Sequence, residues 1–96
     1  MNTANKIIEE MLALYNENQA AHLARFFKTG KGQYGEGDKF IGIKVPLTRR
    51  IVKNYRKSIK KEDIEKLIDS EWHEIRLAGF LLLLEFNTIT KNFQPP

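Results

Sequence analysis

The feature that most constrains this chain is an apolar stretch near its C-terminal end, residues 72–86. At helical spacing one stripe is formed by Trp72, Ile75, Gly79, Leu82 and Phe86, and the rest of the circumference is filled by Phe80, Leu81, Leu83 and Leu84. A helix that is apolar on all sides must be buried on more than one side. Only ten residues follow Phe86, so we expect a further helical repeat or a second molecule to cover the remaining face.

Four earlier segments also have helical periodicity. The sequence predicts helices over Thr3–Tyr15 and Gln19–Lys28, one that begins at Pro46, and a short one that carries Ile64, Leu67 and Ile68. Thr29–Gly42 holds five of the six glycines and is expected to be a long irregular connection. Ser70 is the expected N-cap of the last helix. The stretch KFIGIKV has no strand partner, so we predict an all-α fold of short antiparallel helices.

Length and composition limit the other possibilities. A chain of 96 residues forms at most one small domain, which we expect to span 1–96. It has no cysteine, which excludes disulfides, cysteine zinc sites and thiol nucleophiles. The N-terminus does not resemble a signal peptide, and the longest apolar run, Leu77 to Leu84, is too short to span a bilayer. We therefore expect no membrane association and a cytoplasmic location.

The positive charge is concentrated in one part of the chain. Net charge is +4, and seven basic residues with no intervening acid run from Arg49 to Lys61. One helix face is shared by Arg49, Lys53 and either Arg56 or Lys57, and a second, overlapping row is formed by Arg50, Lys53 and Lys57. Cations at this spacing can contact the phosphates of a nucleic-acid backbone. A lysine-rich face that contacts only solvent explains the same charges equally well.

The glycine-rich connection supplies further candidates for contact with nucleic acid. These are Lys31, Tyr34 and Lys39. Tyr34 and Phe40 are suited either to stacking on bases or to anchoring the connection in the core. For Phe40 we expect the anchoring role, because Ile41 follows it directly.

Motifs for other chemistry are incomplete. Gly30, Gly32 and Gly35 spell GxGxxG, but a helical segment precedes them where dinucleotide binding needs a strand. His73-Glu74 begins like HExxH, yet Leu77 stands where the second histidine is needed. Adjacent acids on a helix point in different directions. We therefore expect no metal, no cofactor and no catalytic residue in this chain.

One block of sequence resembles a known family. Residues 26–55 are similar to the N-terminal region of bacterial DNA alkylation repair proteins of the AlkD-like type. The most recognisable part is Lys39 to Lys53, where the matching residues are Phe40, Gly42, Ile43, Pro46, Arg49 and Arg50. Leu67 to Leu83 is similar to the next helix of the family, so the resemblance extends from about Ala21 to Phe86.

The resemblance implies a solenoid of HEAT-like repeats with a basic concave surface. It also implies a metal-independent DNA glycosylase that removes positively charged alkylated purines by an Asp flanked by tryptophans in later repeats. Here Trp72 is the only tryptophan, and Asp38, Asp63 and Asp69 match no catalytic position. We therefore expect an N-terminal solenoid fragment that binds double-stranded DNA non-specifically through Arg49, Arg50, Lys53, Arg56 and Lys57, without catalysing excision.

Two further expectations follow from this interpretation. The uncovered face of the last helix predicts a homodimer through that helix. The main functional alternative is a helical protein-interaction module whose basic helix docks an acidic partner.

Overall fold

The computed structural model describes residues 2–27, 32 and 36–92, with side chains through residue 86. Its elements are α1 (Thr3–Leu12), α2 (Glu17–Phe26), α3 (Val45–Tyr55), α4 (Lys61–Ile68) and α5 (His73–Asn92). Within these residues the only β-type pairing is an isolated bridge between Lys39 and Trp72. The all-α prediction is therefore confirmed. None of the described helices is long and apolar enough to cross a membrane.

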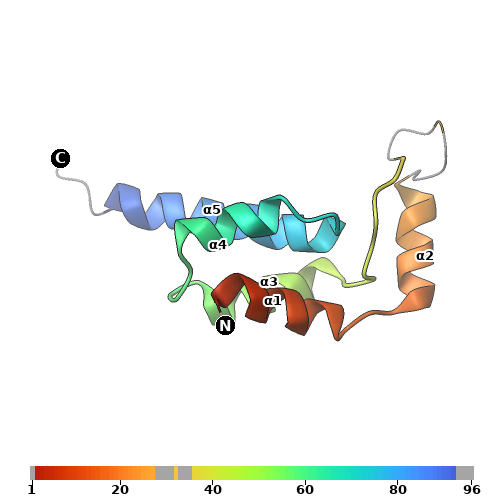
Figure 1. Cartoon of the computed structure of the whole chain (residues 1–96), viewed down its shortest axis with the longest axis horizontal. Coiled ribbons are helices and arrows are strands. Elements are labelled where there is room, and N and C mark those ends of the chain that lie inside the picture. Colours follow the sequence, from red (N-terminus) through yellow and green to blue (C-terminus); the bar gives the residue numbers. More distant parts are fainter. Residues whose placement is uncertain (1, 28–31, 33–35, 93–96) are drawn as a thin grey trace.

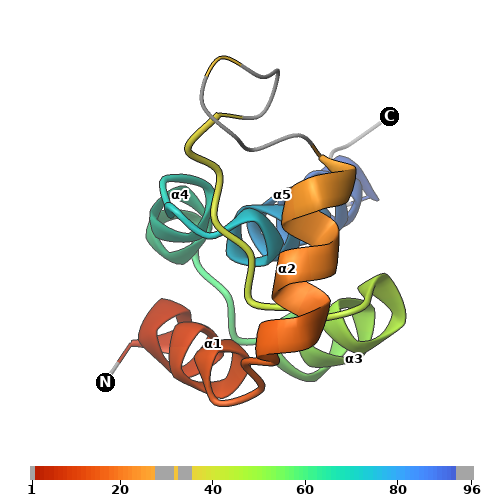
Figure 2. The ribbon, with the colours of Figure 1, turned by 90° about the vertical axis from the view of Figure 1, so that its right-hand side faces the viewer.

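Four of the helices form two layers. α1 and α3 lie side by side in one layer and run in opposite directions, and α4 and α5 do the same in the other (Figure 1). The layers meet because α1 packs against α4 and α3 packs against α5. α2 stands across one end of the two layers (Figure 2).

Each of the four layered helices contributes its apolar stripe to one core. The cluster of buried side chains includes Ile7 and Met11 from α1, Ile51 and Val52 from α3, Ile64 and Leu67 from α4, and Ile75, Ala78 and Leu82 from α5. Gly79 permits the closest contact between α4 and α5, since a Cβ there would lie 2.9 Å from Ile68 Cγ1 and 3.0 Å from Leu67 Cβ. Only a small residue fits at this crossing.

Several helix boundaries differ from the predictions. α1 ends at Leu12, and Tyr15 lies exposed in the turn that follows. α2 begins at Glu17 because the Asn16 side chain accepts a hydrogen bond from Gln19 N–H and caps the helix. The Ser70 hydroxyl accepts from Trp72 N–H, so Ser70 is not the N-cap and α5 begins at His73.

The outer faces of α2 and α5 are only partly covered by the described helices. Ala20 is the only fully buried residue of α2, and Phe26 is 70% exposed. On α5, Phe80 is 49% exposed and Leu84 is 65% exposed, whereas Leu82 is fully buried. The described helices therefore cover only part of the circumference of α5.

A buried carboxylate fixes the segment that leads into α3. Glu74, on the first turn of α5, accepts hydrogen bonds from Ile41 N–H (2.9 Å), Gly42 N–H (2.8 Å) and Ile43 N–H (3.2 Å). The Glu74 residue is only 2% exposed, so these backbone donors replace the water that its charge would otherwise need.

Gly42 allows this segment to pass close to α2. Its φ is +96°, and a Cβ at this position would lie 2.5 Å from Asn16 O and 2.9 Å from Ala20 N. Asn16 N–H also donates to Ile41 O at 2.9 Å. The N-terminus of α2 and the first turn of α5 therefore hold the same short stretch from two sides.

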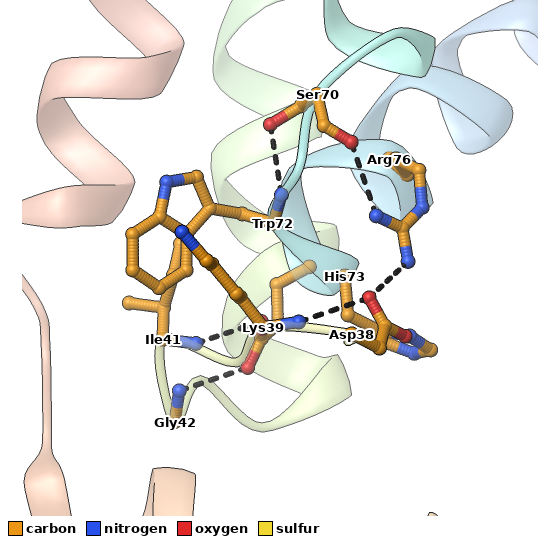
Figure 3. Close-up of polar contacts among 9 residues, drawn as sticks. Asp38, Lys39, Ile41, Gly42, Ser70, Trp72, His73 and Arg76 are labelled. Carbon is orange, nitrogen blue, oxygen red and sulfur yellow. Dashed lines mark hydrogen bonds and ion pairs between the residues drawn. The ribbon is translucent and has the colours of Figure 1, made fainter. Parts of the chain in front are cut away.

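A second acidic residue ties the end of the glycine-rich connection to α5. Asp38 accepts a hydrogen bond from Arg76 at 2.6 Å and contacts His73 Nδ1 at 3.1 Å, while Arg76 also donates to Ser70 O (Figure 3). Burial alone would raise the pKa of Asp38. The hydrogen bonds and positive charge of Arg76 and His73 outweigh burial and hold this pKa below its ordinary value.

The Glu74 contacts predict a large effect on stability. Glu74→Gln places an amide N–H₂ against backbone N–H donors, so we expect the free energy of unfolding to fall by roughly 2–3 kcal/mol. The matched control is Glu71→Gln, three residues earlier, where an exposed carboxylate pairs only with Lys39, and we expect a loss of less than about 1 kcal/mol. Urea unfolding followed by circular dichroism measures both. Equal losses in the two variants would contradict this role for Glu74.

Candidate nucleic-acid interface

The basic residues of α3 lie on its outer face because its apolar residues face the core. Thr48, Ile51 and Val52 are buried, whereas Arg49, Arg50 and Lys53 are exposed. Pro46 lies in the first turn of the helix, as predicted. The cationic side chains are thus presented to solvent on a rigid helix that is packed against α1 and α5.

The other two predicted residues lie beyond the end of α3. Arg56 follows the last helical residue, is half-buried, and forms an ion pair with Glu85 at 3.7 Å. Lys57 lies in the turn before α4 and is exposed. The two rows expected from helical spacing therefore extend past the helix, and one of their members is partly neutralised.

Arg49 and Arg50 point toward opposite flanks of α3. Arg49 lines a small groove with Val52, Leu81, Leu84 and Glu85, between α3 and α5. Arg50 instead lines a pocket near the first turn of α3. Adjacent helical residues diverge by about 100°, so the paired arginines widen the basic surface.

The positive charge of the chain is concentrated in the segment that contains this surface. Nine basic residues and no acid lie between Lys39 and Lys61, which gives this segment a charge of +9 against −5 for the remainder. Among the described residues, no carboxylate forms an ion pair with Arg49, Arg50, Lys53 or Lys57. These four cations are therefore available to an external anion.

The loop candidates have different placements. Lys39 forms an ion pair with Glu71 at 3.2 Å and lies 6.0 Å from the centre of the Trp72 ring. Lys31 and Tyr34 lie outside the described residues. Phe40 is 5% exposed, which confirms that it anchors the connection in the core.

An aromatic stack surrounds Phe40 that sequence analysis did not identify. The Phe40 ring stacks on His73 at 4.6 Å between ring centroids and on Phe27 at 5.3 Å, and Phe26 meets Phe27 edge-on at 5.1 Å. These residues come from α2, the connection and α5. Helical spacing within one segment does not reveal such a stack, because it forms only when the three segments meet.

The remaining titratable groups with resolved partners have structural roles. Asp63 is buried and accepts from Ala4 N–H and Lys60 N–H, which ties α1 to the start of α4. A hydrogen bond to Glu10, together with burial, raises the pKa of Tyr55. The described part of the chain contains no cluster of three or more His, Asp or Glu side chains that could hold a metal ion.

One basic residue of this region was missed by the sequence analysis. Lys44 is exposed immediately before α3 and lines the same pocket as Arg50. The signal was available, because the run without acids begins at Lys39 rather than at Arg49. The pocket itself was not predictable, since its other wall belongs to residues 14–19.

Comparison with known proteins assigns the chain to a family. The family model described as DNA alkylation repair enzyme matches residues 7–94, which include all of α3, α4 and α5. No curated protein and no solved structure matches the chain. Since the matched region covers nearly the whole sequence, this chain belongs to the DNA alkylation repair enzyme family.

Proposed function

We propose that this chain is a DNA-binding portion of a DNA alkylation repair glycosylase and that α3 contacts the phosphate backbone of double-stranded DNA. The observation that carries the proposal is a set of exposed cations on the outer face of α3 and the turn after it that have no acidic partner within the described part of the chain: Arg49, Arg50, Lys53 and Lys57. Evenly spaced cations on a rigid surface supply most of the sequence-independent affinity for DNA.

The contrast with other cations of the chain supports this assignment. Arg76 is neutralised by Asp38, and Lys39 by Glu71. In the opposite layer, the exposed acids of α4 are matched by two exposed lysines, Lys61 and Lys66, so its exposed charges cancel. The resulting field attracts a polyanion to the α3 side more strongly than to the α4 side.

We also propose that the two layers correspond to HEAT-like repeats. In this arrangement α1 and α3 form the first antiparallel pair, and α4 and α5 form the second. The contacts of α1 with α4 and of α3 with α5 are those that stacking of two such pairs requires. α3 and α5 would then lie on the same side of the stack.

The catalytic role is proposed to lie outside this chain. Removal of a cationic alkylated purine needs a carboxylate and aromatic groups that are free to stabilise the cationic nucleotide as its base departs. Asp38 and Asp63 are already engaged by Arg76 and by two backbone N–H groups, respectively. Trp72 lies under the Lys39 side chain.

Salt dependence of DNA binding tests the role of α3. We expect dissociation constants on the order of micromolar or weaker at physiological salt. Replacing Arg49, Arg50 and Lys53 together by Ala should reduce the slope of log K against log[salt] by about 2–3, because each phosphate contact contributes roughly 0.9. Fluorescence anisotropy with a labelled duplex, repeated over a series of salt concentrations, gives the slope.

A matched triple variant controls for net charge. Replacing Lys6, Arg25 and Lys66 by Ala removes the same charge from α1, α2 and α4, and the slope should then change little. An unchanged slope in the α3 variant would remove these residues from the DNA surface. If this chain bound an acidic protein but had no measurable affinity for DNA, the result would favour the interaction-module alternative.

Base excision gives an independent test. We expect this chain to release no 7-methylguanine from methylated duplex DNA above the spontaneous rate, because Asp38 and Asp63 are engaged in structural contacts and Asp69 matches no catalytic position of the family. Chromatography of the released bases measures this directly. Excision that is abolished by Asp38→Asn, in a variant that remains folded, would instead identify a catalytic group in this chain.

We further propose that α5 mediates a homodimer. Phe80 and Leu84 are one helical turn apart and are largely exposed, and burial of such a side chain is worth about 1.5–3 kcal/mol. Phe80→Glu with Leu84→Glu should therefore shift sedimentation toward the monomer while the helical content persists. Tyr15→Glu, at an exposed aromatic residue in the α1–α2 turn, is the control. A monomeric wild-type chain at hundreds of micromolar would contradict the dimer.

A further inference from the structure

A pocket of about 550 Å³ lies between the start of α2 and the start of α3. One wall comes from the α1–α2 turn and the start of α2, and the other comes from the segment before α3 and the first turns of that helix. The lining residues are Leu14, Asn16, Gln19, Gly42, Ile43, Lys44, Pro46, Leu47 and Arg50. Its volume falls within the range of about 300–1,000 Å³ that small-molecule sites occupy. The Glu74 and Gly42 contacts described above hold the second wall against α2, so the pocket is a fixed part of the fold.

Two cations line this pocket without an acid to neutralise them. Lys44 and Arg50 are both exposed, and neither forms an ion pair with a carboxylate of the described residues. By contrast, two half-buried arginines of this chain do have acidic partners, Glu85 for Arg56 and Asp38 for Arg76. Two cations that converge on one concave site are matched by a group with close to two negative charges.

The rest of the lining is suited to a nucleotide. Leu14, Pro46 and Leu47 provide an apolar wall for a base or sugar. Gln19 contributes a side-chain amide, and Asn16 retains its N–H₂ donors because its oxygen already accepts from Gln19 N–H. Small-molecule sites have this composition, in which an apolar surface is combined with a few orienting polar groups.

We propose that this pocket binds a nucleotide that carries a terminal phosphate, with the phosphate between Lys44 and Arg50 and the nucleoside against Leu14, Pro46 and Leu47. A phosphomonoester carries a charge of about −1.5 to −2 at neutral pH, whereas a phosphodiester inside a strand carries only −1. The two cations therefore favour a strand end or a free mononucleotide over the interior of a strand. The positive end of the α3 dipole adds to this preference.

The position of the pocket connects it to the proposed DNA surface. Arg50 belongs both to the pocket and to the row that continues through Lys53 to Lys57. A strand that follows this row toward the N-terminus of α3 reaches the pocket. The strand-end form of the inference rests on the proposed DNA-binding function, and the mononucleotide form does not.

Oligonucleotides that differ only in their ends test the inference. Two duplexes of one sequence, with 5′-phosphate or 5′-hydroxyl ends and a fluorescent label at the 3′ end, are titrated with the protein. We expect the phosphorylated duplex to bind about tenfold more tightly, a difference of about 1.4 kcal/mol. Lys44→Ala should abolish this preference, whereas Lys6→Ala, an exposed lysine on α1, should retain it.

Competition distinguishes the two sources of the phosphate. A deoxynucleoside monophosphate that displaces the phosphorylated duplex at a concentration where the deoxynucleoside does not would identify a mononucleotide site. End preference without displacement would identify a strand-end site. Either result supports the pocket.

Other outcomes would contradict the pocket proposal or the DNA-binding function. Equal affinity for the two duplexes, with no displacement by the monophosphate, would overturn the proposal, as would an end preference that survives Lys44→Ala. Binding of the monophosphate to a chain that fails to bind hydroxyl-ended duplex would contradict the DNA-binding function while leaving the pocket supported. Circular dichroism verifies that each variant is folded.

Discussion

The position of α3 depends on the burial of one charge. The Glu74 carboxylate lies almost without exposure beneath the segment that leads into this helix, and three consecutive backbone N–H groups satisfy it. Loss of these donors would leave an uncompensated charge in the interior, which is strongly unfavourable. The segment 41–43 is therefore fixed relative to α5, and Gly42 lets the same segment rest against α2. The direction of α3, its basic face and the pocket beside it follow from this arrangement.

Charges in this protein fall into two groups with different consequences. Asp38, Asp63 and Glu74 are engaged by backbone N–H groups or by basic side chains and hold the segments of the fold together. The exposed cations of α3 have no such partners among the described residues. Because they repel one another, they do not stabilise the fold. The lack of ion pairs between these cations and the described carboxylates is the physical basis for assigning the α3 side to a polyanion and not to the stability of the domain.

The sequence predicted the helices better than their ends or their contacts. Periodicity identified the four layered helices because one face of each packs in the core, and it identified α2 although only Ala20 of that helix is buried. The start of α2 was predicted two residues too late because the capping role of Asn16 was not recognised. Glu74 was noticed as part of an incomplete HExxH motif, yet it accepts hydrogen bonds from residues more than thirty positions earlier. Asp38, Arg76 and the stack around Phe40 depend on similarly distant partners.

By itself the sequence determined the fold class, the placement of Pro46 in the first turn of a helix, the basic character of that helix and the likeness to DNA alkylation repair proteins. These properties are local, since they depend on spacing and charge within a few turns of chain. Only the tertiary structure decided that Arg56 is paired with Glu85, that Lys44 and Arg50 share a pocket, and that Phe80 and Leu84 remain exposed. Such properties depend on which distant segments meet, and that is set by packing and by the need to satisfy buried polar groups.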